Sequence, residues 1–381
     1  MESAGILVEL GAVLIALAVL ARLANRFGIP AIPLYLVAGL AFGRGGLLPL
    51  VTTAQFLGIG AEIGLILLLF MLGLEYSASQ LISTLGREAP MGLIDLLLNF
   101  TPGFVAGFLL GWGVLAAVVL GGVAFVSSSG VVAKLLQHGP RGRPEKSLVV
   151  SLLIMEDLAM AVFLPILAAL LIGGTDWGGL ASALIAVLGV AVILLVATRL
   201  DVGLSRVLFS HSDEALLLTI LGLTVAVAGI AERFQVSAAV GALIVGIILA
   251  GPAVERAQAL VSPLRDLFAA LFFVFFGLTI DPSSLVSVLG PAALLALVTS
   301  GTKFLTAWVS VRKLSARSRL RMGSLLISRG EFSIAIAGLG VAAGLRADLG
   351  PLAAAYVLIT TIAGPFVALF VSKSNSFDGF W

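Results

Sequence analysis

The chain has 381 residues, of which 60% are hydrophobic and only 11% are charged. A soluble domain is about a quarter charged, so this composition indicates a membrane protein, and the net charge of +2 is too small to suggest a nucleic-acid partner. The absence of cysteine excludes disulfides and thiolate metal sites, and the two histidines, His138 and His211, lie in predicted loops.

Hydrophobic runs of spanning length follow one another along the whole chain, separated by short polar breaks. A bilayer core about 30 Å thick takes roughly 20 helical residues. We therefore predict an all-α polytopic membrane protein, in which residues 1–381 form a single transmembrane unit ending in a short cytoplasmic tail, 373–381. The thirteen predicted helices are 4–24, 29–48, 54–74, 89–112, 113–137, 147–173, 179–199, 213–232, 235–252, 263–281, 290–311, 321–345 and 349–372.

The distribution of lysine and arginine between the loops predicts the orientation. Odd-numbered loops and the tail together carry 17 basic residues, whereas even-numbered loops carry 3. The positive-inside rule then places the N-terminus outside and the C-terminus in the cytoplasm of a cell (inner) membrane. The basic cytoplasmic loops 138–146 and 312–321 are suited to dock a separate regulatory protein.

The two halves of the chain resemble each other segment by segment. Each match lies seven helices after its partner, and because seven is odd the two copies must cross the membrane in opposite directions. The matched segments are 23–43 with 230–250, 61–83 with 265–287, and 127–130 with 327–330.

These matches predict a first inverted repeat over 1–173, a linker helix over 179–199 and a second inverted repeat over 213–372. Each repeat contains six helices. Inverted repeats are typical of secondary transporters, whose binding site lies at the repeat interface near the middle of the membrane.

Two adjacent acids, Glu156 and Asp157, lie near the middle of the predicted helix 147–173. A carboxylate at the bilayer centre costs about 2.5–3.5 kcal/mol, so it must face protein or a water-filled cavity. A buried carboxyl favours a bound proton, while an arriving cation favours the charged form. Proton and monovalent cation should therefore compete for Asp157, with Glu156 about 100° away around the helix.

The run Ser127, Ser128, Ser129 and Gly130 interrupts an apolar span. Serine hydroxyls compete for backbone partners and glycine weakens a helix, so this is a suitable place for a break. Small-residue helix packing uses the same residues. Because a similar run occupies 328–331 in the other half, we favour two crossed, broken helices, with the three serines helping to bind the ion.

Lys303 and Arg329 are the two basic residues that are assigned neither to a loop nor to the tail, and both lie inside predicted spans. The expected partner of Lys303 is Glu156 or Asp157. Arg329 and Glu331 are two residues apart, so on a regular helix they would not face each other. This spacing fits a local break or separate partners, such as Arg329 with Glu156, and we assign Lys303, Arg329 and Glu331 a charge-compensating role.

Asp95 and Asn99 form a further polar pair within the predicted helix 89–112. Their i, i+4 spacing puts both side chains on the same face of the helix. They are therefore candidates either for lining the ion cavity or for bonding to a neighbouring helix.

The serine run, the acid-Asp motif in LLIMEDLAMAVFLP, Lys303 and the segment ISRGEFSIAIAGLG resemble the monovalent cation:proton antiporters. Within them, the membrane domain of the Kef-type potassium/proton branch is the most similar, over nearly the whole chain. The resemblance implies an NhaA/NapA-like antiporter fold and a homodimer, in which a mobile core carries the ion by an elevator-type movement. It also implies that Asp157 binds ion and proton and that Lys303 is the core lysine.

The chain departs from the Kef-type pattern in two respects. Many Kef-type proteins have glutamine where this chain has Glu156, so the number of protons exchanged stays open: one if Asp157 alone titrates, more if Lys303 or Glu156 also releases a proton. Kef-type proteins also often continue into a cytoplasmic nucleotide-binding regulatory domain. We expect that domain to be a separate subunit or a missing C-terminal part.

The sequence thus predicts exchange of K⁺, or alternatively Na⁺, for H⁺ by alternating access, with no cofactor and a role in pH homeostasis. The alternative is a sodium-coupled symporter of organic anions on a similar scaffold. The acid pair disfavours it, because anion sites prefer helix N-termini and spare basic residues. An enzyme is not expected, since the chain lacks the HExxH and GxSxG motifs.

Overall fold

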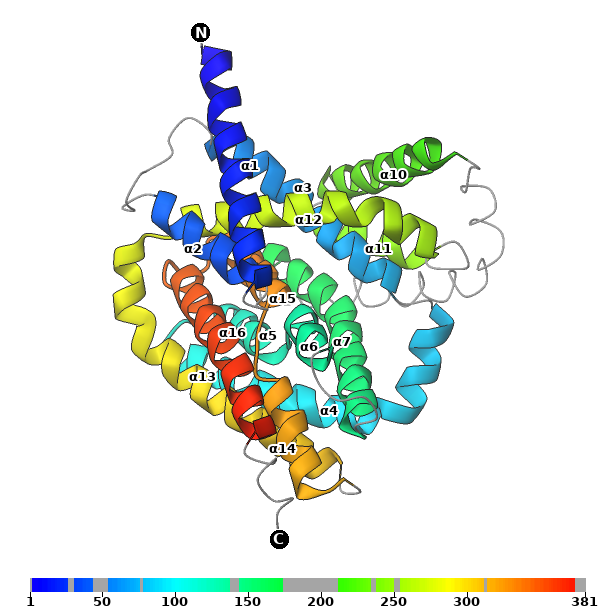
Figure 1. Ribbon diagram of the computed structural model, residues 1–381, viewed down its shortest axis with the longest axis vertical. Helices are drawn as coiled ribbons and strands as arrows, with labels where there is room; N and C mark the ends of the chain where they lie inside the picture. Colours follow the sequence, from blue (N-terminus) through cyan, green and yellow to red (C-terminus); the bar gives the residue numbers. More distant parts are fainter. Residues whose placement is uncertain are drawn as a thin grey trace. The chain divides into compact units, whose positions relative to one another are not determined.

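The computed structural model describes residues 2–26, 31–43, 54–75, 78–137, 144–173, 212–233, 238–249, 254–311 and 314–373 (Figure 1). Regular structure within these ranges is helical throughout. The predicted linker helix 179–199 and the tail beyond residue 373 lie outside them. The helices are α1 (Glu2–Arg26), α2 (Ile32–Phe42), α3 (Ala54–Glu75), α4 (Ala78–Leu109), α5 (Val114–Phe125), α6 (Ser129–Gln137), α7 (Glu145–Gly173), α10 (Asp213–Arg233), α11 (Ala238–Leu249), α12 (Val254–Leu278), α13 (Pro282–Ser310), α14 (Ala316–Leu325), α15 (Glu331–Ala342) and α16 (Leu349–Lys373).

The chain forms two compact units, each assembled from separate stretches of sequence. The first unit comprises Met1–Ala54, Glu88–Glu156 and Phe276–Trp381, and the second comprises Gln55–Arg87 and Asp157–Phe275. Each unit therefore takes residues from both halves of the chain. Helix α7 continues from the first unit into the second.

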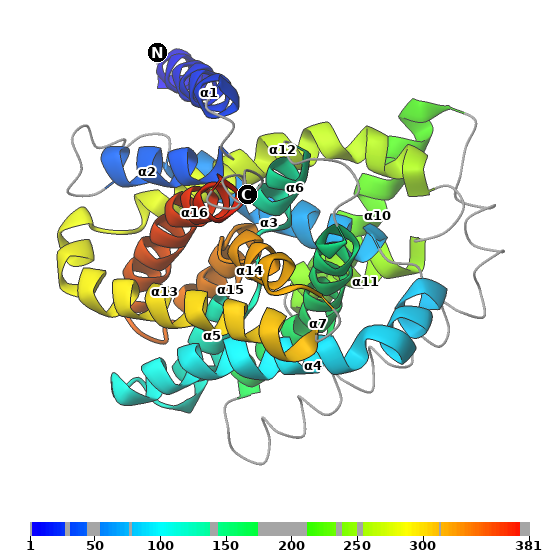
Figure 2. The same cartoon turned by 60° about the horizontal axis from the view of Figure 1, so that its bottom comes forward.

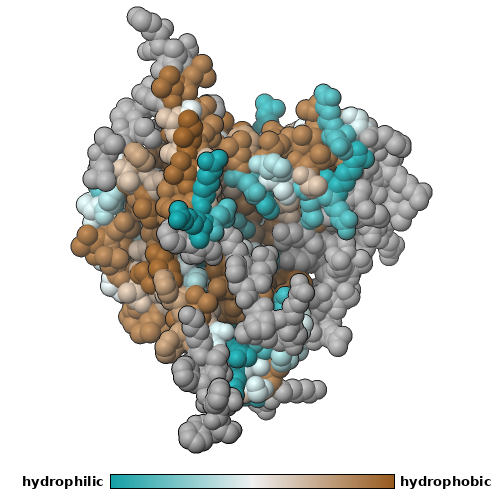
Figure 3. Space-filling view, viewed as in Figure 1, coloured by the Kyte–Doolittle hydropathy of each residue, from teal (hydrophilic) through white to brown (hydrophobic). Residues whose placement is uncertain are grey.

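Seven helical spans within the described ranges are long and apolar enough to cross a membrane, one of them running over both α5 and α6. Bulky apolar side chains are exposed along them, for example Leu294 (63%) and Phe366 (70%), and hydrophobic residues cover much of the face in Figure 3. The predicted all-helical, multi-pass membrane protein is confirmed at this level, while the count of thirteen spans stays a prediction. The seven spans are Ala89–Leu109, Val114–Ala133, Glu145–Leu171, Asp213–Arg233, Glu255–Leu278, Pro282–Ser310 and Leu349–Ser372.

Several helices extend beyond the apolar runs that predicted them. Helix α4 begins at Ala78 rather than near residue 89, because its first turns are polar and hydropathy detects only the apolar part. Helix α13 begins after Asp281, whose carboxylate accepts a hydrogen bond from the Ser283 amide at 2.8 Å. This bond lowers the pKa of Asp281, which precedes the membrane-spanning segment.

Two helices of the first unit are interrupted. Residues 126–128 separate α5 from α6, and residues 326–330 separate α14 from α15. The Ser128 amide donates a hydrogen bond to the Ser328 carbonyl at 2.8 Å, so the two interruptions meet. A Cβ atom at Gly330 would lie 2.5 Å from the Ser128 hydroxyl oxygen, so glycine is required for this approach. The breaks overlap the two predicted runs, Ser127–Gly130 and 328–331, although Ser129, Gly130 and Glu331 are helical.

Helix packing holds α7 and α13 close to the interrupted helices within the first unit. Helix α16 packs along α13 and contacts α14 and α15, while α15 also packs against α5 (Figure 1 and Figure 2). A cluster of buried apolar side chains joins α4, α6, α7, α13 and α14. It consists of Met91, Val132, Val149, Leu152, Leu153, Ala307, Val311, Met322 and Leu326.

Helices α3 and α11 of the second unit approach each other through glycines. A Cβ atom at Gly246 would lie 2.2 Å from the Phe70 carbonyl oxygen, and one at Gly73 would lie 2.3 Å from the Leu243 carbonyl oxygen. Such small-residue contacts replace hydrophobic driving force in membranes, where lipid is as apolar as leucine.

We expect Gly246→Ala to lower the melting temperature in detergent by several degrees, because the Phe70 backbone must move away. The matched control is Gly222→Ala on α10 of the same unit, where an added Cβ meets nothing within 4 Å. Alanine is favoured over glycine within a helix, so Gly222→Ala should be neutral or stabilising. Equal melting temperatures for the two variants would contradict close packing at Gly246.

Candidate functional site

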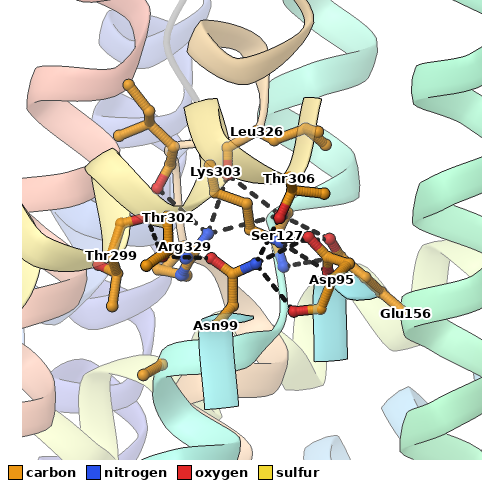
Figure 4. Close-up of polar contacts among 12 residues, drawn as sticks. Asp95, Asn99, Ser127, Glu156, Thr299, Thr302, Lys303, Thr306, Leu326 and Arg329 are labelled. Carbon is orange, nitrogen blue, oxygen red and sulfur yellow. Dashed lines mark hydrogen bonds and ion pairs between the residues drawn. The ribbon is translucent and has the colours of Figure 1, made fainter. Parts of the chain in front are cut away.

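Lys303 lies at the centre of a buried polar network in the first unit (Figure 4). Its side chain is 0% exposed. Its ammonium donates to both carboxyl oxygens of Asp95 at 2.9 Å each, and to Glu156 Oε1 at 2.7 Å. The sequence suggested Glu156 or Asp157 as the partner. Of these two acids the structure brings Glu156 to Lys303, and it adds Asp95, which the sequence did not connect to the lysine.

Asp95 and Asn99 bond across the contact between α4 and α13. Asn99 Nδ2 donates to Asp95 Oδ1 at 2.8 Å and to Thr306 Oγ1 at 3.2 Å. The Thr302 hydroxyl donates to Asn99 Oδ1 at 2.8 Å. Asp95 and Asn99 are both 0% exposed. Of the two roles that the sequence left open for this pair, the described contacts fit bonding between helices.

Glu156 has partners on both of its carboxyl oxygens. Oε1 accepts from the Ser127 hydroxyl at 2.9 Å as well as from Lys303, and Oε2 accepts from the Ser127 backbone amide at 2.5 Å. This amide lies two residues before the first residue of α6, near the helix N-terminus, whose partial positive charge favours an anion. Glu156 therefore links α7 to the first interrupted helix and to α13.

Asp157 follows Glu156 on α7 and is 4% exposed. Successive residues on a helix point about 100° apart, so the two carboxyls face different directions. Glu156 is bonded to both Lys303 and Ser127. Of the other predicted serines, Ser128 is 5% exposed and Ser129 begins α6.

Arg329 holds the second interruption together. Its side chain is 0% exposed, and Nε donates to the Tyr356 hydroxyl at 2.9 Å. Nη1 donates to the carbonyls of Leu326 at 2.9 Å and Ile327 at 3.3 Å, while Nη2 is buried and has no hydrogen-bond partner among the residues that the structure describes. The suggestion that Arg329 pairs with Glu156 was wrong, because the broken helix exposes its own carbonyls to the guanidinium.

Tyr356 is a site residue that the sequence analysis missed. It lies on α16, is 0% exposed, and its hydroxyl also bonds to the Thr299 hydroxyl at 3.0 Å. A lone tyrosine inside an apolar span is the only available signal, since its buried hydroxyl needs a partner. Glu331 is partly buried. Because it is the first residue of α15, its carboxylate lies at the positive end of that helix.

Buried acids and bases around two interrupted membrane helices define a class of protein, the ion-coupled secondary transporters. The chain belongs to the transmembrane sodium/hydrogen exchanger family, which matches residues 13–373. It is therefore a multi-pass membrane transporter and not an enzyme. The resemblance to cation:proton antiporters of Kef type is confirmed by the same match and by relatives that are named as K⁺/H⁺ and K⁺ efflux antiporters.

Two of the relatives match over nearly the whole length of both chains. The K⁺/H⁺ antiporter subunit KhtU of Bacillus subtilis is 35% identical, over 94% of this chain and 92% of its own length. The ammonium/H⁺ antiporter subunit AmhT of Alkalihalophilus pseudofirmus is 32% identical, over 97% of this chain and 94% of its own length. Among solved structures, the sodium proton antiporter MjNhaP1 of Methanocaldococcus jannaschii has a TM-score of 0.71 at 20% identity, covering 98% and 99% of the two chains, which shows the shared fold.

Proposed function

We propose that this chain exchanges a monovalent cation for H⁺ by alternating access, and that K⁺ is the preferred cation. Asp157 binds either the cation or the proton. The observation that carries the proposal is the balance of charge. The buried charged side chains of residues 89–109 of α4, of α7 beyond its first residue, of α13 and of the segment 326–330 are three acids and two bases. They are Asp95, Glu156, Asp157, Lys303 and Arg329.

These five side chains leave one negative charge uncompensated when all are ionised. One proton or one monovalent cation neutralises it, and the two compete because each disfavours the other. An uncompensated charge in the bilayer core costs several kcal/mol. The loaded carrier therefore crosses between its two states more readily than the empty one, and this difference couples the two ion fluxes.

Contacts between the two predicted repeats support alternating access. In the repeat, Gly39 corresponds to Gly246 and Gly73 corresponds to Gly277. A Cβ at Gly73 would lie 2.9 Å from the Gly246 Cα, and a Cβ at Gly277 would lie 2.8 Å from the Gly39 Cα. Helix α3 therefore contacts α11 in the same way as its counterpart α12 contacts α2. Two inverted repeats that exchange helices are expected to show such a pair of equivalent contacts.

The finer description of the transporter follows from the family resemblance and from loop charge. The homodimer moves its core domain in an elevator-type step, in the inner membrane, with the N-terminus outside and the C-terminus in the cytoplasm. KhtU and AmhT are both named as subunits, which supports a separate regulatory partner for this chain. A sodium-coupled organic-anion symporter is not favoured, because the charge left over in the network is negative.

The named relatives also bear on the choice of ion. One is named for K⁺ and the other for ammonium, and these two ions are similar in size and larger than Na⁺. The purified protein in proteoliposomes should therefore release protons against K⁺ and Rb⁺, at half-saturating concentrations about tenfold lower than for Na⁺ and Li⁺.

The assay compares the four chlorides at several pH values, with a pH-sensitive dye inside the vesicles. Protein-free vesicles and the exposed-site variant Glu232→Gln serve as controls. Proton movement that no alkali cation drives would refute the proposed exchange, and a preference for Na⁺ would reverse its selectivity.

A further inference from the structure

We propose that the junction between α13 and α14 binds an anionic phospholipid. The lipid phosphate lies on the Arg319 guanidinium, and an acyl chain follows the exposed apolar side of α13 past Trp308. Both helices belong to the first unit, and the binding of lipid there does not depend on which ions the protein exchanges. The proposal assigns to lipid a surface whose basic charge first suggested a protein partner.

One side of α13 carries an exposed apolar stripe that ends at Trp308. Its side chains lie three, four or seven residues apart, so they share one face of the helix. Helix α13 is long and apolar enough to cross a membrane, and an exposed apolar face of such a helix contacts hydrocarbon. The members of the stripe are Leu294, Leu297, Val298, Leu305, Trp308 and Val309.

Trp308 and Arg319 stack on each other at the end of this stripe. Trp308 is 46% exposed and lies on the last turn of α13, whereas Arg319 lies on α14, after the connection 311–315. The Arg319 Cζ atom is 5.3 Å from the centre of the Trp308 ring. Tryptophan concentrates at the level of lipid headgroups, and the stack holds the guanidinium beside it. Because a guanidinium has five N–H donors, it binds a phosphate in addition to other partners.

The charge of the surrounding sequence favours an anion. No acidic residue lies between Asp281 and Glu331, while the segment 312–321 contains five basic residues. The acid of the neighbouring α7 is its first residue, Glu145, which is 1% exposed. Its Oε1 atom lies 3.9 Å from Arg321 Nη1, so it offsets one of the five positive charges. The five basic residues are Arg312, Lys313, Arg317, Arg319 and Arg321.

Apolar side chains next to the arginines make lipid a better fit than a soluble protein. Leu305 and Val309 on α13 and Leu320 on α14 are exposed beside the stacked pair. Leu305 and Val309 belong to a membrane span, where a lipid chain reaches them and a soluble subunit does not. The proposed orientation puts this end of α13 at the cytoplasmic leaflet, whose anionic lipids attract basic segments.

Melting temperature in a neutral detergent tests whether lipid binds. The probes are phosphatidylglycerol, phosphatidylcholine of the same chain length, and glycerol 3-phosphate, which has the phosphate without acyl chains. A ligand that binds only the folded state raises the melting temperature. We expect phosphatidylglycerol to raise that of the wild-type protein by about 2 °C or more beyond phosphatidylcholine, and glycerol 3-phosphate to have no such effect.

Two results for the wild-type protein would overturn the proposal. Equal shifts with phosphatidylglycerol and phosphatidylcholine would show that lipid charge is not recognised, and would leave the basic surface to the proposed regulatory partner. A shift with glycerol 3-phosphate equal to that with phosphatidylglycerol would show a site for soluble anions.

Variants of the stacked pair test where the lipid binds. Arg319→Gln removes the charge that meets the phosphate, so the phosphatidylglycerol concentration that gives half of the shift should rise about tenfold. The shift with phosphatidylcholine should not change. Arg319→Lys keeps the charge without the planar fork, so it should recover part of the loss. Trp308→Leu keeps the apolar surface but removes the stack, and should raise that concentration about threefold.

The matched control is Arg346→Gln, at an exposed arginine of the same unit that precedes α16. The proposed orientation puts Arg346 on the opposite side of the membrane, so this variant should bind phosphatidylglycerol as the wild-type protein does. If Arg319→Gln failed to fold, Arg319→Lys and Trp308→Leu would still decide the matter. Wild-type lipid concentrations in all the folded variants of Arg319 and Trp308 would overturn the site. No ion flux is measured, so this outcome is separate from that of the proposed exchange.

Discussion

Replacing Asp157 by asparagine is expected to lower the rate of cation-driven proton movement in proteoliposomes by about 100-fold or more. The side chains have nearly the same size, so the buried position at 4% exposure should still be filled. Asparagine neither takes up a proton nor offers a negative charge to a cation. The three acids and two bases would become two of each, which removes the one charge for which H⁺ and the cation compete.

The measurement pairs proton flux with melting temperature in detergent, so that loss of transport is separated from loss of fold. Glu232→Gln at the exposed end of α10 is the matched acid-to-amide control and should transport normally. Exchange at the wild-type rate by folded Asp157→Asn would rule out Asp157 as the exchanging acid. Glu156 would then take its place in the mechanism.

Replacing Arg329 by methionine is expected to cause the largest loss of stability among the substitutions proposed for this protein. The change removes donors from the Tyr356 hydroxyl and from the Leu326 carbonyl, which Arg329 contacts at 2.9 Å each. A hydrogen bond to a charged group contributes about 1.5–3 kcal/mol, and a buried carbonyl left without a donor adds a penalty. We expect a loss of about 3 kcal/mol or more, seen as a fall in melting temperature of roughly 5 °C or more.

Arg329→Lys should not rescue this loss, because one ammonium cannot reproduce the fork that reaches Tyr356 and the carbonyls together. The matched control is Arg346→Met, at an exposed arginine before α16, which should leave the melting temperature nearly unchanged. If the melting temperature of Arg329→Met equalled that of the wild-type protein, the guanidinium would not be the group that stabilises the second interruption.

Local chemistry made several features of this protein predictable from the sequence. The Ser127–Gly130 run and its counterpart after residue 327 predicted interrupted helices, because serine and glycine weaken a helix wherever they cluster. The spacing of Asp95 and Asn99 likewise predicted that they would share a helix face, and they do bond to each other.

Pairings between distant segments could not be predicted in the same way. Asp95 and Lys303 are 208 residues apart, and a single sequence does not report which face of α4 meets α13. The partner of Arg329 was misassigned for a related reason. We matched charge to charge, whereas the carbonyls that accept from the guanidinium exist only because the helix is broken there.

The hydrogen bond between the Ser128 amide and the Ser328 carbonyl joins the two interrupted helices through main-chain atoms alone. An alanine scan removes side chains and leaves this bond in place. Such a scan would therefore not detect this bond, whatever other effect the loss of the two hydroxyls has. Because the bond does not depend on the side chains, other residues at these two positions could keep the two helices joined. Sequence variability there would therefore say little about structural importance.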